Sequence, residues 1–371
     1  AKSNILDTIK LDKALRLAKQ KSKDGHLQEA KNICEDILQK YSKNKQALTV
    51  LQTLADEYNS IANAQMKKGD SEVAIESYKQ AISIKPDYAE AYYNLAILLE
   101  RNGNPDAAID SYKQVLKIIP NYAGAYNNIG NTQKGMGDFE AAISSYSRAV
   151  LIKPNYAEAY YNLGLTQHDK GDLKAAIGSY NDALKIKPEY AEAYNNMGNA
   201  QKGEGDLDAS INSYKRSIKI KPDYANAYYN MGNALKDKGE LEAAVVYYKQ
   251  AVKITPNYFE AYSNMGVALK DNGLLEAAID CYQRVLKINP NYAEAHFNMG
   301  IAFLDKGDRE TAMECYKRAI EIQPNNGDAH INKAFLYLGL RDFEAGWPLF
   351  EWRWKVSKDV PQFLETSKPL W

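Results

Sequence analysis

A period of 34 residues runs through most of the chain and constrains its fold more than any other feature. Prolines recur at this interval from Pro86 to Pro324, and glycines recur from Gly69 to Gly307. A period of about 20 to 50 residues is typical of arrays in which each unit buries its apolar face against the next unit. We therefore interpret the 371 residues as one repeat array rather than as two or three unrelated domains.

Residues 89–122 show why each unit is expected to be a pair of antiparallel helices. Apolar side chains in the first half follow helical spacing, and Gly103 marks the end of that helix because the residue after a helix often needs a positive φ. The second helix must end before Pro120. In most units an aspartate follows the glycine and is predicted to cap the second helix, as at Asp138, Asp172, Asp206 and Asp308.

Position 8 of the unit, counted from Ala89 as position 1, is restricted to glycine and alanine. A glycine inside a helix costs about 1 kcal/mol relative to alanine, so its recurrence needs a compensating gain. The small side chains at this position therefore predict that two helix backbones approach closely, and that this packing offsets the cost. The residues at this position are Ala62, Ala96, Gly130, Gly164, Gly198, Gly232, Gly266, Gly300 and Ala334.

Counting outward from the regular part gives about ten units. Residues 1–44 are predicted to form an N-terminal cap and a degenerate first repeat, and residues 45–88 a second repeat whose first helix is lengthened by ten extra residues. Seven regular repeats occupy residues 89–326. Residues 327–371 are predicted to form a divergent tenth repeat and a tryptophan-rich C-terminal capping or junction segment.

The unit resembles the tetratricopeptide repeat (TPR) family in its length and in its proline, glycine, alanine and tyrosine positions. This resemblance implies an all-α, right-handed superhelical solenoid of helix-turn-helix repeats. It also implies that the first helices line a concave groove, and that the protein is a scaffold that binds an extended peptide or a partner domain there.

Position 6, which the resemblance places in the groove, is asparagine in eight consecutive units. An amide offers a donor and an acceptor, so a row of amides can pair with the backbone of an extended peptide without reading its side chains. Alternatively, these residues hydrogen-bond the neighbouring helix and orient the stack. The predicted asparagine ladder consists of Asn94, Asn128, Asn162, Asn196, Asn230, Asn264, Asn298 and Asn332.

Four lysines at position 12 are predicted to line the same groove. They favour an acidic or phosphorylated ligand, and the alternative is an ordinary solvated helix face. These lysines are Lys134, Lys202, Lys236 and Lys270.

The predicted groove becomes apolar in its last two units. The residues there are Phe297, Ile301, Leu304, Ile331, Phe335 and Leu338. Because an exposed apolar patch of this kind usually has a partner, we expect residues 343–371 to fold back and cover it. The apolar partners in the tail are Trp347, Phe350, Trp352 and Trp354, and helical spacing puts Trp347, Phe350 and Trp354 on one face. Alternatively, a downstream domain or a second molecule covers the patch.

The asparagine row also resembles the repeat arm of the O-linked N-acetylglucosamine transferases. In addition, residues 343–354 resemble the junction at which bacterial repeat arrays lead into a glycosyltransferase domain. The alternative function is therefore a substrate-recruiting N-terminal arm of a glycosyltransferase whose catalytic domain lies beyond residue 371.

Composition and spacing argue against other classes of function. The 47 basic and 47 acidic residues balance, which gives no footprint for nucleic acid, and the apolar runs are too short to span a membrane. The three cysteines and four histidines lack metal-ligand spacing, and no catalytic constellation is found. We expect a non-enzymatic cytoplasmic protein without a cofactor or a metal, and we expect Cys281 and Cys315 on a helix surface.

Positions 22 and 23 are expected to face outward on the second helix. They are polar or small in most units but become Val246 and Tyr247 in one. This apolar pair predicts a homodimer contact, and the alternative is ordinary surface.

Overall fold

The computed structural model describes residues 4–356, which form two compact units, residues 4–187 and 188–356. Within this described part the secondary structure is helical, with no strand. Both units are solenoids of antiparallel helix pairs, so the predicted all-α fold of helix-turn-helix repeats is confirmed. The right-handed superhelical twist stays a prediction.

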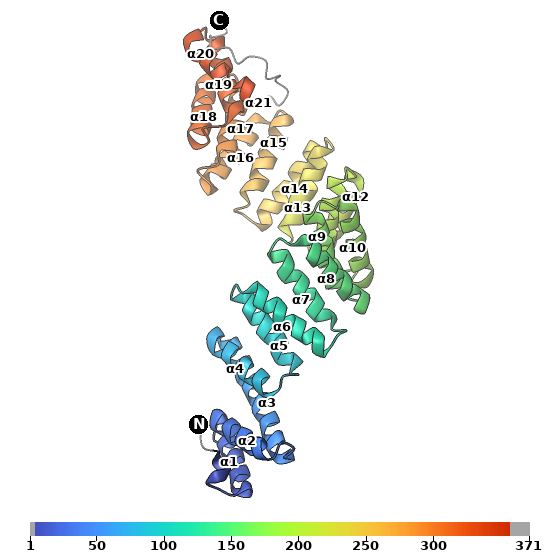
Figure 1. Cartoon of the computed structure of the whole chain (residues 1–371). Helices are drawn as coiled ribbons and strands as arrows, with labels where there is room; N and C mark the ends of the chain where they lie inside the picture. Colours follow the sequence, from blue (N-terminus) through green and yellow to red (C-terminus); the bar gives the residue numbers. More distant parts are fainter. Residues whose placement is uncertain (1–3, 357–371) are drawn as a thin grey trace. The chain divides into compact units, whose positions relative to one another are not determined.

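The first unit contains five helix pairs after a short 3₁₀ helix, η1 (Ile5–Asp7) (Figure 1). The first helices of the pairs are α1 (Leu11–Lys23), α3 (Lys45–Lys68), α5 (Ala89–Arg101), α7 (Ala123–Gly135) and α9 (Ala157–Asp169). The second helices are α2 (Leu27–Lys40), α4 (Ser71–Ile84), α6 (Pro105–Ile118), α8 (Phe139–Ile152) and α10 (Leu173–Ile186). With 24 residues, α3 is much longer than the 13-residue α5.

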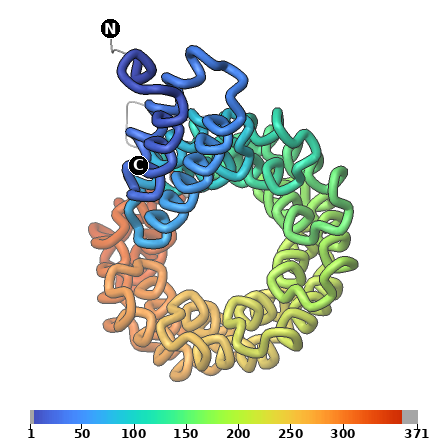
Figure 2. The backbone as a smooth tube through the Cα atoms, turned by 90° about the horizontal axis from the view of Figure 1, so that it is seen from below, coloured from blue at the N-terminus to red at the C-terminus, as the bar shows by residue number. Residues whose placement is uncertain are grey.

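The second unit contains the remaining helix pairs, which follow an arc in the view of Figure 2. Its first helices are α11 (Ala191–Gly203), α13 (Ala225–Asp237), α15 (Phe259–Asp271), α17 (Ala293–Asp305) and α19 (Gly327–Gly339). Its second helices are α12 (Leu207–Ile220), α14 (Leu241–Ile254), α16 (Leu275–Ile288), α18 (Arg309–Ile322) and α20 (Phe343–Phe350), and a last turn, α21, spans Arg353–Val356.

Local sequence explains where the helices begin and end. Gly103 and its equivalents have φ values of 75 to 90° from Gly69 to Gly307, which only glycine adopts at little cost. The Asp206 side chain accepts a hydrogen bond from the Ala209 amide at 2.9 Å, and Asp138, Asp172 and Asp308 cap their helices in the same way. Both predicted punctuation signals are confirmed.

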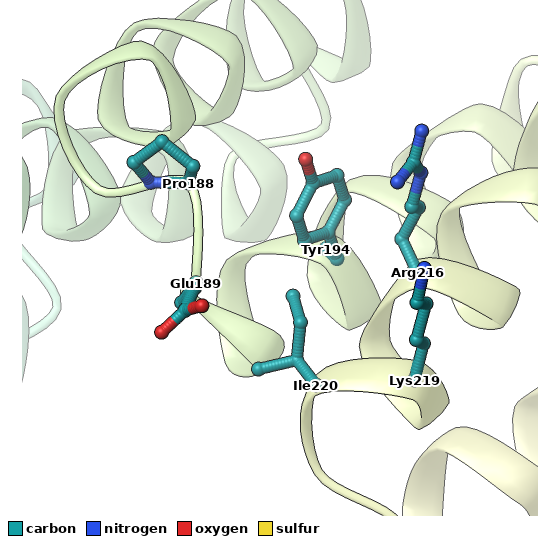
Figure 3. A pocket seen from close by; sticks show the side chains of 6 residues that line it. All are labelled: Pro188, Glu189, Tyr194, Arg216, Lys219 and Ile220. Carbon is teal, nitrogen blue, oxygen red and sulfur yellow. The ribbon is translucent and has the colours of Figure 1, made fainter.

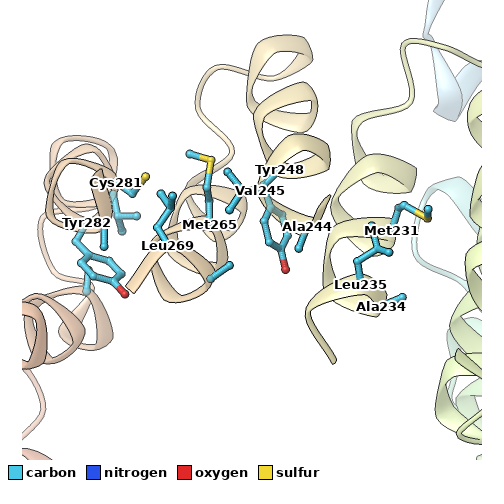
Figure 4. Close-up of a cluster of buried hydrophobic side chains, with 14 of the residues drawn as sticks. Met231, Ala234, Leu235, Ala244, Val245, Tyr248, Met265, Leu269, Cys281 and Tyr282 are labelled. Atoms are coloured by element: carbon cyan, nitrogen blue, oxygen red, sulfur yellow. The ribbon is translucent and has the colours of Figure 1, made fainter. Parts of the chain in front are cut away.

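The core is organised around the tyrosine at position 24 of each unit. These rings, from Tyr78 to Tyr316, are fully buried. Figure 4 shows Tyr248 and Tyr282 in the core of the second unit, among side chains such as Met265 and Leu269. Each ring lies against the position-8 residue of its own hairpin, since a Cβ on Gly232 would lie 2.6 Å from Cε1 of Tyr248. The close approach predicted for position 8 is therefore an approach of a ring to a helix backbone.

The burial of position 23 corrects two predictions, namely that Cys281 and Cys315 lie on a helix surface and that position 23 faces outward. Cys281 and Cys315 are only 7% and 5% exposed, so they do not lie on a helix surface. Serines occupy this position in earlier repeats, and Ser213 donates a hydrogen bond to Oε1 of Gln201 at 2.6 Å. Position 23 therefore packs against position 11 of the first helix of the same hairpin.

Candidate peptide-binding groove

Successive first helices contact one another within each unit and form a continuous face. In the second unit α11 contacts α13, α13 contacts α15, and α15 contacts α17, while in the first unit α7 contacts α9. The second helices contact the next first helix instead, as α12 does with α13. The face of the first helices is therefore the more tightly curved one, and it carries the predicted asparagine ladder.

The ladder asparagines are half-buried, and the amide nitrogens of five of them donate hydrogen bonds to the preceding repeat. Nδ2 of Asn94 donates to Oδ1 of Asn63 at 3.1 Å, and Nδ2 of Asn230 donates to Oδ1 of Asn195 at 3.0 Å. Asn63 and Asn195 both belong to the preceding repeat. The ladder thus contributes to the stacking of repeats, which was the alternative considered from sequence.

Two further ladder residues show the same arrangement with two acceptors each. Nδ2 of Asn162 donates to Oδ1 of Asn127 and of Asn131, both at 3.2 Å. Nδ2 of Asn264 donates to the Tyr229 hydroxyl at 3.0 Å and to Oδ1 of Asn233 at 2.9 Å. Each of these bonds fixes the amide plane, with the nitrogen toward the preceding repeat.

Nδ2 of Asn128 makes the equivalent contacts, with the Tyr93 hydroxyl at 2.9 Å and the Tyr112 hydroxyl at 3.2 Å. Oδ1 of Asn128 and of Asn196 also accept a hydrogen bond from the adjacent Asn127 and Asn195, whereas Asn298 and Asn332 are half-buried where the groove becomes apolar.

Sequence reasoning missed the acceptors of this network, most of which lie at positions 5 and 9. Position 5 is Tyr93, Asn127, Asn195 or Tyr229 in the bonds described above. The sequence contains a signal for the acceptors at position 5, because this position alternates between asparagine and tyrosine over several repeats, and both residues can accept a hydrogen bond.

The framework tyrosines connect to the same network through position 9. The Tyr214 hydroxyl donates to Oδ1 of Asn199 at 2.8 Å, and the Tyr248 hydroxyl donates to Oδ1 of Asn233 at 2.7 Å. Where position 9 is apolar, as at Val267, the buried Tyr282 hydroxyl has no hydrogen-bond partner among the described residues. Burial raises the pKa of Tyr78 to about 12 and that of Tyr214 still further, so these phenols remain protonated donors at neutral pH.

The predicted lysine row is largely neutralised by aspartates. Nζ of Lys134 lies 3.0 Å from Asp169, and Nζ of Lys202 lies 2.9 Å from Asp237, each aspartate belonging to the following repeat. Lys270 pairs with the adjacent Asp271 at 3.0 Å. Within residues 4–356, Lys236 is the member of the row that has no carboxylate partner.

A hollow of about 310 Å³ opens on this face between α11 and α13. Its lining residues are Asn199, Lys202, Gly203, Tyr214, Asn230 and Asn233. It therefore brings together one ladder amide, the two position-9 amides and one predicted groove lysine. Such a site offers polar groups to a chain that lies across the first helices, and it contains no candidate nucleophile.

The apolar residues predicted at the C-terminal end of the groove do lie together. Phe297 packs on Tyr316 with ring centroids 5.9 Å apart, and Ile301 and Leu304 join the same cluster. Ile331 and Leu338 are half-buried, whereas Phe335 remains 55% exposed although its ring lies 5.4 Å from that of Phe350.

Only part of the tail that was predicted to cover this patch lies within the described residues. Phe350 occupies the framework tyrosine position of the last hairpin, and Trp352 stacks on His330 with ring centroids 4.1 Å apart. Trp347 and Trp354 remain 53% and 48% exposed. Residues 357–371 lie outside the described residues, so the predicted coverage of the groove stays a prediction.

The apolar pair predicted to mediate a homodimer is smaller than expected. Val246 is 56% exposed, but Tyr247 is half-buried and its ring lies 6.2 Å from that of Tyr228 in the same hairpin. The homodimer stays a prediction that now depends mainly on Val246.

The structure gives further information about chemistry and membranes. Within residues 4–356 no group of His, Cys, Asp and Glu side chains could hold a metal ion. Burial raises the pKa of Cys281 and of Cys315 to about 11, so both thiols are protonated and weakly nucleophilic at neutral pH. In the same part of the chain, no helix has the length and apolar character needed to cross a membrane.

Comparisons with known structures returned other repeat proteins. The crystal structure of YrrB, described as a TPR protein with an unusual peptide-binding site, is 25% identical over 50% of this chain and 95% of that chain, with a TM-score of 0.44. MamA is 30% identical over 46% and 94% of the two chains, with a TM-score of 0.43. PilF of Pseudomonas aeruginosa is 19% identical over 56% and 94%, with a TM-score of 0.48. No curated protein sequence matched.

Comparison with family models is more specific. A model described as TPR repeat matches residues 62–103, 135–171, 167–205, 203–239, 232–273 and 268–307. Two models described as tetratricopeptide repeat match residues 89–122 and 293–326, and residues 315–347. Since the first model alone matches more than half of the chain, the protein belongs to the tetratricopeptide repeat family, whose members are scaffolds for protein interactions.

Proposed function

We propose that this scaffold binds an extended peptide segment of a partner protein along the face of its first helices, and that the asparagine ladder accepts hydrogen bonds from the peptide backbone. The observation that carries the proposal is the orientation of the ladder amides. Asn94, Asn162, Asn230 and Asn264 each direct Nδ2 to the preceding repeat. The opposite atom of each amide, Oδ1, is an acceptor that these bonds do not use.

This orientation gives the groove a chemical polarity. An amide free to rotate would offer either a donor or an acceptor in any direction, whereas a ladder amide held through its nitrogen keeps its oxygen as an acceptor in a fixed position. Adjacent packed helices lie about 10 Å apart, and an extended chain advances about 3.4 Å per residue. One ladder oxygen therefore serves about every third peptide residue, and the ligand supplies backbone N–H groups.

The lysine–aspartate pairs refine the predicted preference for an acidic ligand. Lys134 and Lys202 are neutralised by Asp169 and Asp237, so the groove has no continuous positive row. We propose that recognition depends on backbone pairing and shape, with Lys236 as a local site for one acidic side chain.

The test compares two alanine variants that break the same hydrogen bond from opposite ends. Asn230→Ala removes both the bond to Asn195 and the proposed ligand acceptor. Asn195→Ala removes the bond but keeps Oδ1 of Asn230, and Asn195 is only 3% exposed. The ligand is a peptide selected from a library of random synthetic sequences against the intact chain.

We expect Asn230→Ala to weaken peptide binding by about 0.5–1.5 kcal/mol, since that is the net contribution of one hydrogen bond. Asn195→Ala should lower the free energy of unfolding by a similar amount, with a smaller effect on affinity, as measured by calorimetry. Methylation of peptide nitrogens at every third residue should reproduce the loss. Equal affinities for wild type and Asn230→Ala would leave the ladder with a stacking role only.

A second candidate function is the substrate-recruiting arm of a glycosyltransferase. One support is the resemblance of the asparagine row to the repeat arm of the O-linked N-acetylglucosamine transferases. The other is the last hairpin, which departs from the repeat because α20 has only 8 residues and contains Pro348. This role requires a catalytic domain after residue 371 in the native protein. This role would be supported if the native protein transferred a sugar to a groove-binding peptide and lost that activity when the ladder asparagines were replaced. A native protein without transferase activity would exclude it.

A further inference from the structure

The second unit carries a basic hollow on its hairpin α11–α12, formed by residues outside the asparagine ladder. Two adjoining cavities, of about 340 and 750 Å³, share Tyr194, Arg216 and Lys219 in their lining. Figure 3 shows the Tyr194 ring between Pro188 on one side and Arg216 and Lys219 on the other. The larger cavity extends along α12 to Lys215.

Three cations of this hollow carry charge that no neighbouring carboxylate compensates. Lys215, Arg216 and Lys219 are exposed, and within residues 4–356 none of them has a carboxylate at ion-pair distance. At some equivalent positions of other repeats the cation is paired on its own helix, as Lys113 is with Asp110, Lys185 with Asp182, and Arg318 with Glu321. In α14, among the described residues, Lys249 and Lys253 have no carboxylate at ion-pair distance either, so they provide a matched control. Among the lining residues the one carboxylate is Glu189, at the Pro188 end. The side formed by α12 is therefore left with uncompensated positive charge.

The spacing of the cations indicates the form of the ligand. Lys215 and Lys219 are four residues apart on one helix, which separates them by about 6 Å along its axis. In an extended chain, side chains on one face recur every second residue, about 7 Å apart. A helical row of cations at this spacing matches alternate carboxylates of an extended segment, and the Tyr194 ring supplies an apolar surface beside that row (Figure 3).

We propose that the hollow lined by Tyr194, Lys215, Arg216 and Lys219 is a second docking surface, which binds an acidic extended peptide segment of a partner protein. It is independent of the asparagine ladder, because the two sites share no residue. A partner with an acidic segment next to its groove-binding segment would therefore engage the scaffold at two sites, and linkage of the two would raise its overall affinity.

The experiment measures binding of a fluorescein-labelled peptide of alternating glutamate and serine by fluorescence anisotropy. The charge-reversed variant is Lys215→Glu with Lys219→Glu. Its control, Lys249→Glu with Lys253→Glu, makes the same change of net charge at the equivalent positions of α14. All four side chains belong to solvent-facing positions of their helices, and circular dichroism checks that both variants stay folded.

The expected result is a loss of affinity of about ten-fold or more in the α12 variant and of no more than about two-fold in the α14 control. Binding should also weaken between about 50 and 300 mM salt. The peptide with glutamine in place of glutamate should not bind. Asn230→Ala should leave the affinity for the acidic peptide unchanged, which separates this site from the groove.

Three results would overturn the proposal. Equal losses in the two variants would show that net charge alone attracts the peptide. Unchanged binding in the α12 variant would place the peptide elsewhere. Displacement of the peptide by inorganic phosphate at equal concentration, or tighter binding of a single-stranded oligonucleotide, would identify a phosphate site instead of a peptide site.

Discussion

Replacing Gly198 with alanine is expected to destabilise the array, although alanine is the better helix former. Gly198 lies against the fully buried ring of Tyr214. A Cβ added to Gly198 would lie 2.6 Å from Cε1 and 2.9 Å from Cδ1 and Cζ of that ring. Carbon atoms attract one another at about 3.5–4.0 Å, so the ring or the helix must move by about 1 Å.

The magnitude follows from two opposing effects. Alanine in place of glycine stabilises a helix interior by about 1 kcal/mol, whereas overpacking a core costs about 1–3 kcal/mol. The ring cannot turn away freely, because the Tyr214 hydroxyl donates to Asn199 at 2.8 Å. We expect a net loss of about 0–2 kcal/mol for Gly198→Ala and a larger loss for Gly198→Leu. Ala96 at the equivalent position shows that a methyl group is tolerated once the neighbouring ring has adjusted.

The assay is urea unfolding followed by far-UV circular dichroism, with Gly178→Ala as the matched control. Gly178 lies inside α10, and an added Cβ there would meet no atom within 4 Å, so this variant should gain about 0.5–1 kcal/mol. The double variant Gly198→Leu with Tyr214→Ala should lose less than the sum of the single losses, because removal of the ring makes room for the leucine. Equal gains for Gly198→Ala and Gly178→Ala, or strictly additive losses, would refute the argument.

Three further predictions follow from the core. Tyr214→Phe should lose about 1 kcal/mol through its hydrogen bond, whereas Tyr282→Phe should be neutral or stabilising because its buried hydroxyl has no partner in the described part of the chain; chemical unfolding compares them directly. Gln201→Leu should cost about 1–2 kcal/mol by leaving the buried Ser213 hydroxyl unpaired, and Ser213→Cys in the same chain should restore most of the loss, since leucine and cysteine occupy these two positions in a later repeat. The contribution of the buried tyrosines to stability should be constant below about pH 10 and should fall as the pH rises towards about 12, because the unfolded chain then loses phenolic protons that the folded chain keeps. Burial raises the pKa of Tyr78 from 10.0 to about 12, and each such tyrosine lowers the free energy of unfolding by about 1.4 kcal/mol per pH unit in this range; an alkaline titration without such a fall would contradict this.

The sequence alone determined the secondary structure and the register of the repeats. A proline at Pro120, a glycine at Gly103 and an aspartate at Asp206 act on the backbone within a few residues, so their effects can be predicted without knowledge of the fold. The same locality explains why position 8 could be recognised as a close approach. Its partner, the position-24 tyrosine, lies in the same hairpin and follows at a fixed separation in sequence.

Only the tertiary structure decided how the groove side chains are used. Asn230 donates to Asn195, 35 residues earlier, and Lys202 pairs with Asp237, 35 residues later. Both contacts depend on the rotation and offset between successive hairpins. Those quantities are set by how the apolar faces interlock, and no residue pattern within one unit specifies them. Packing also decided that Cys281, which has the pattern of a surface position, is buried. The sequence therefore predicted the groove residues only through the resemblance to the repeat family, and packing between repeats determined which of their amide atoms are bonded within the stack.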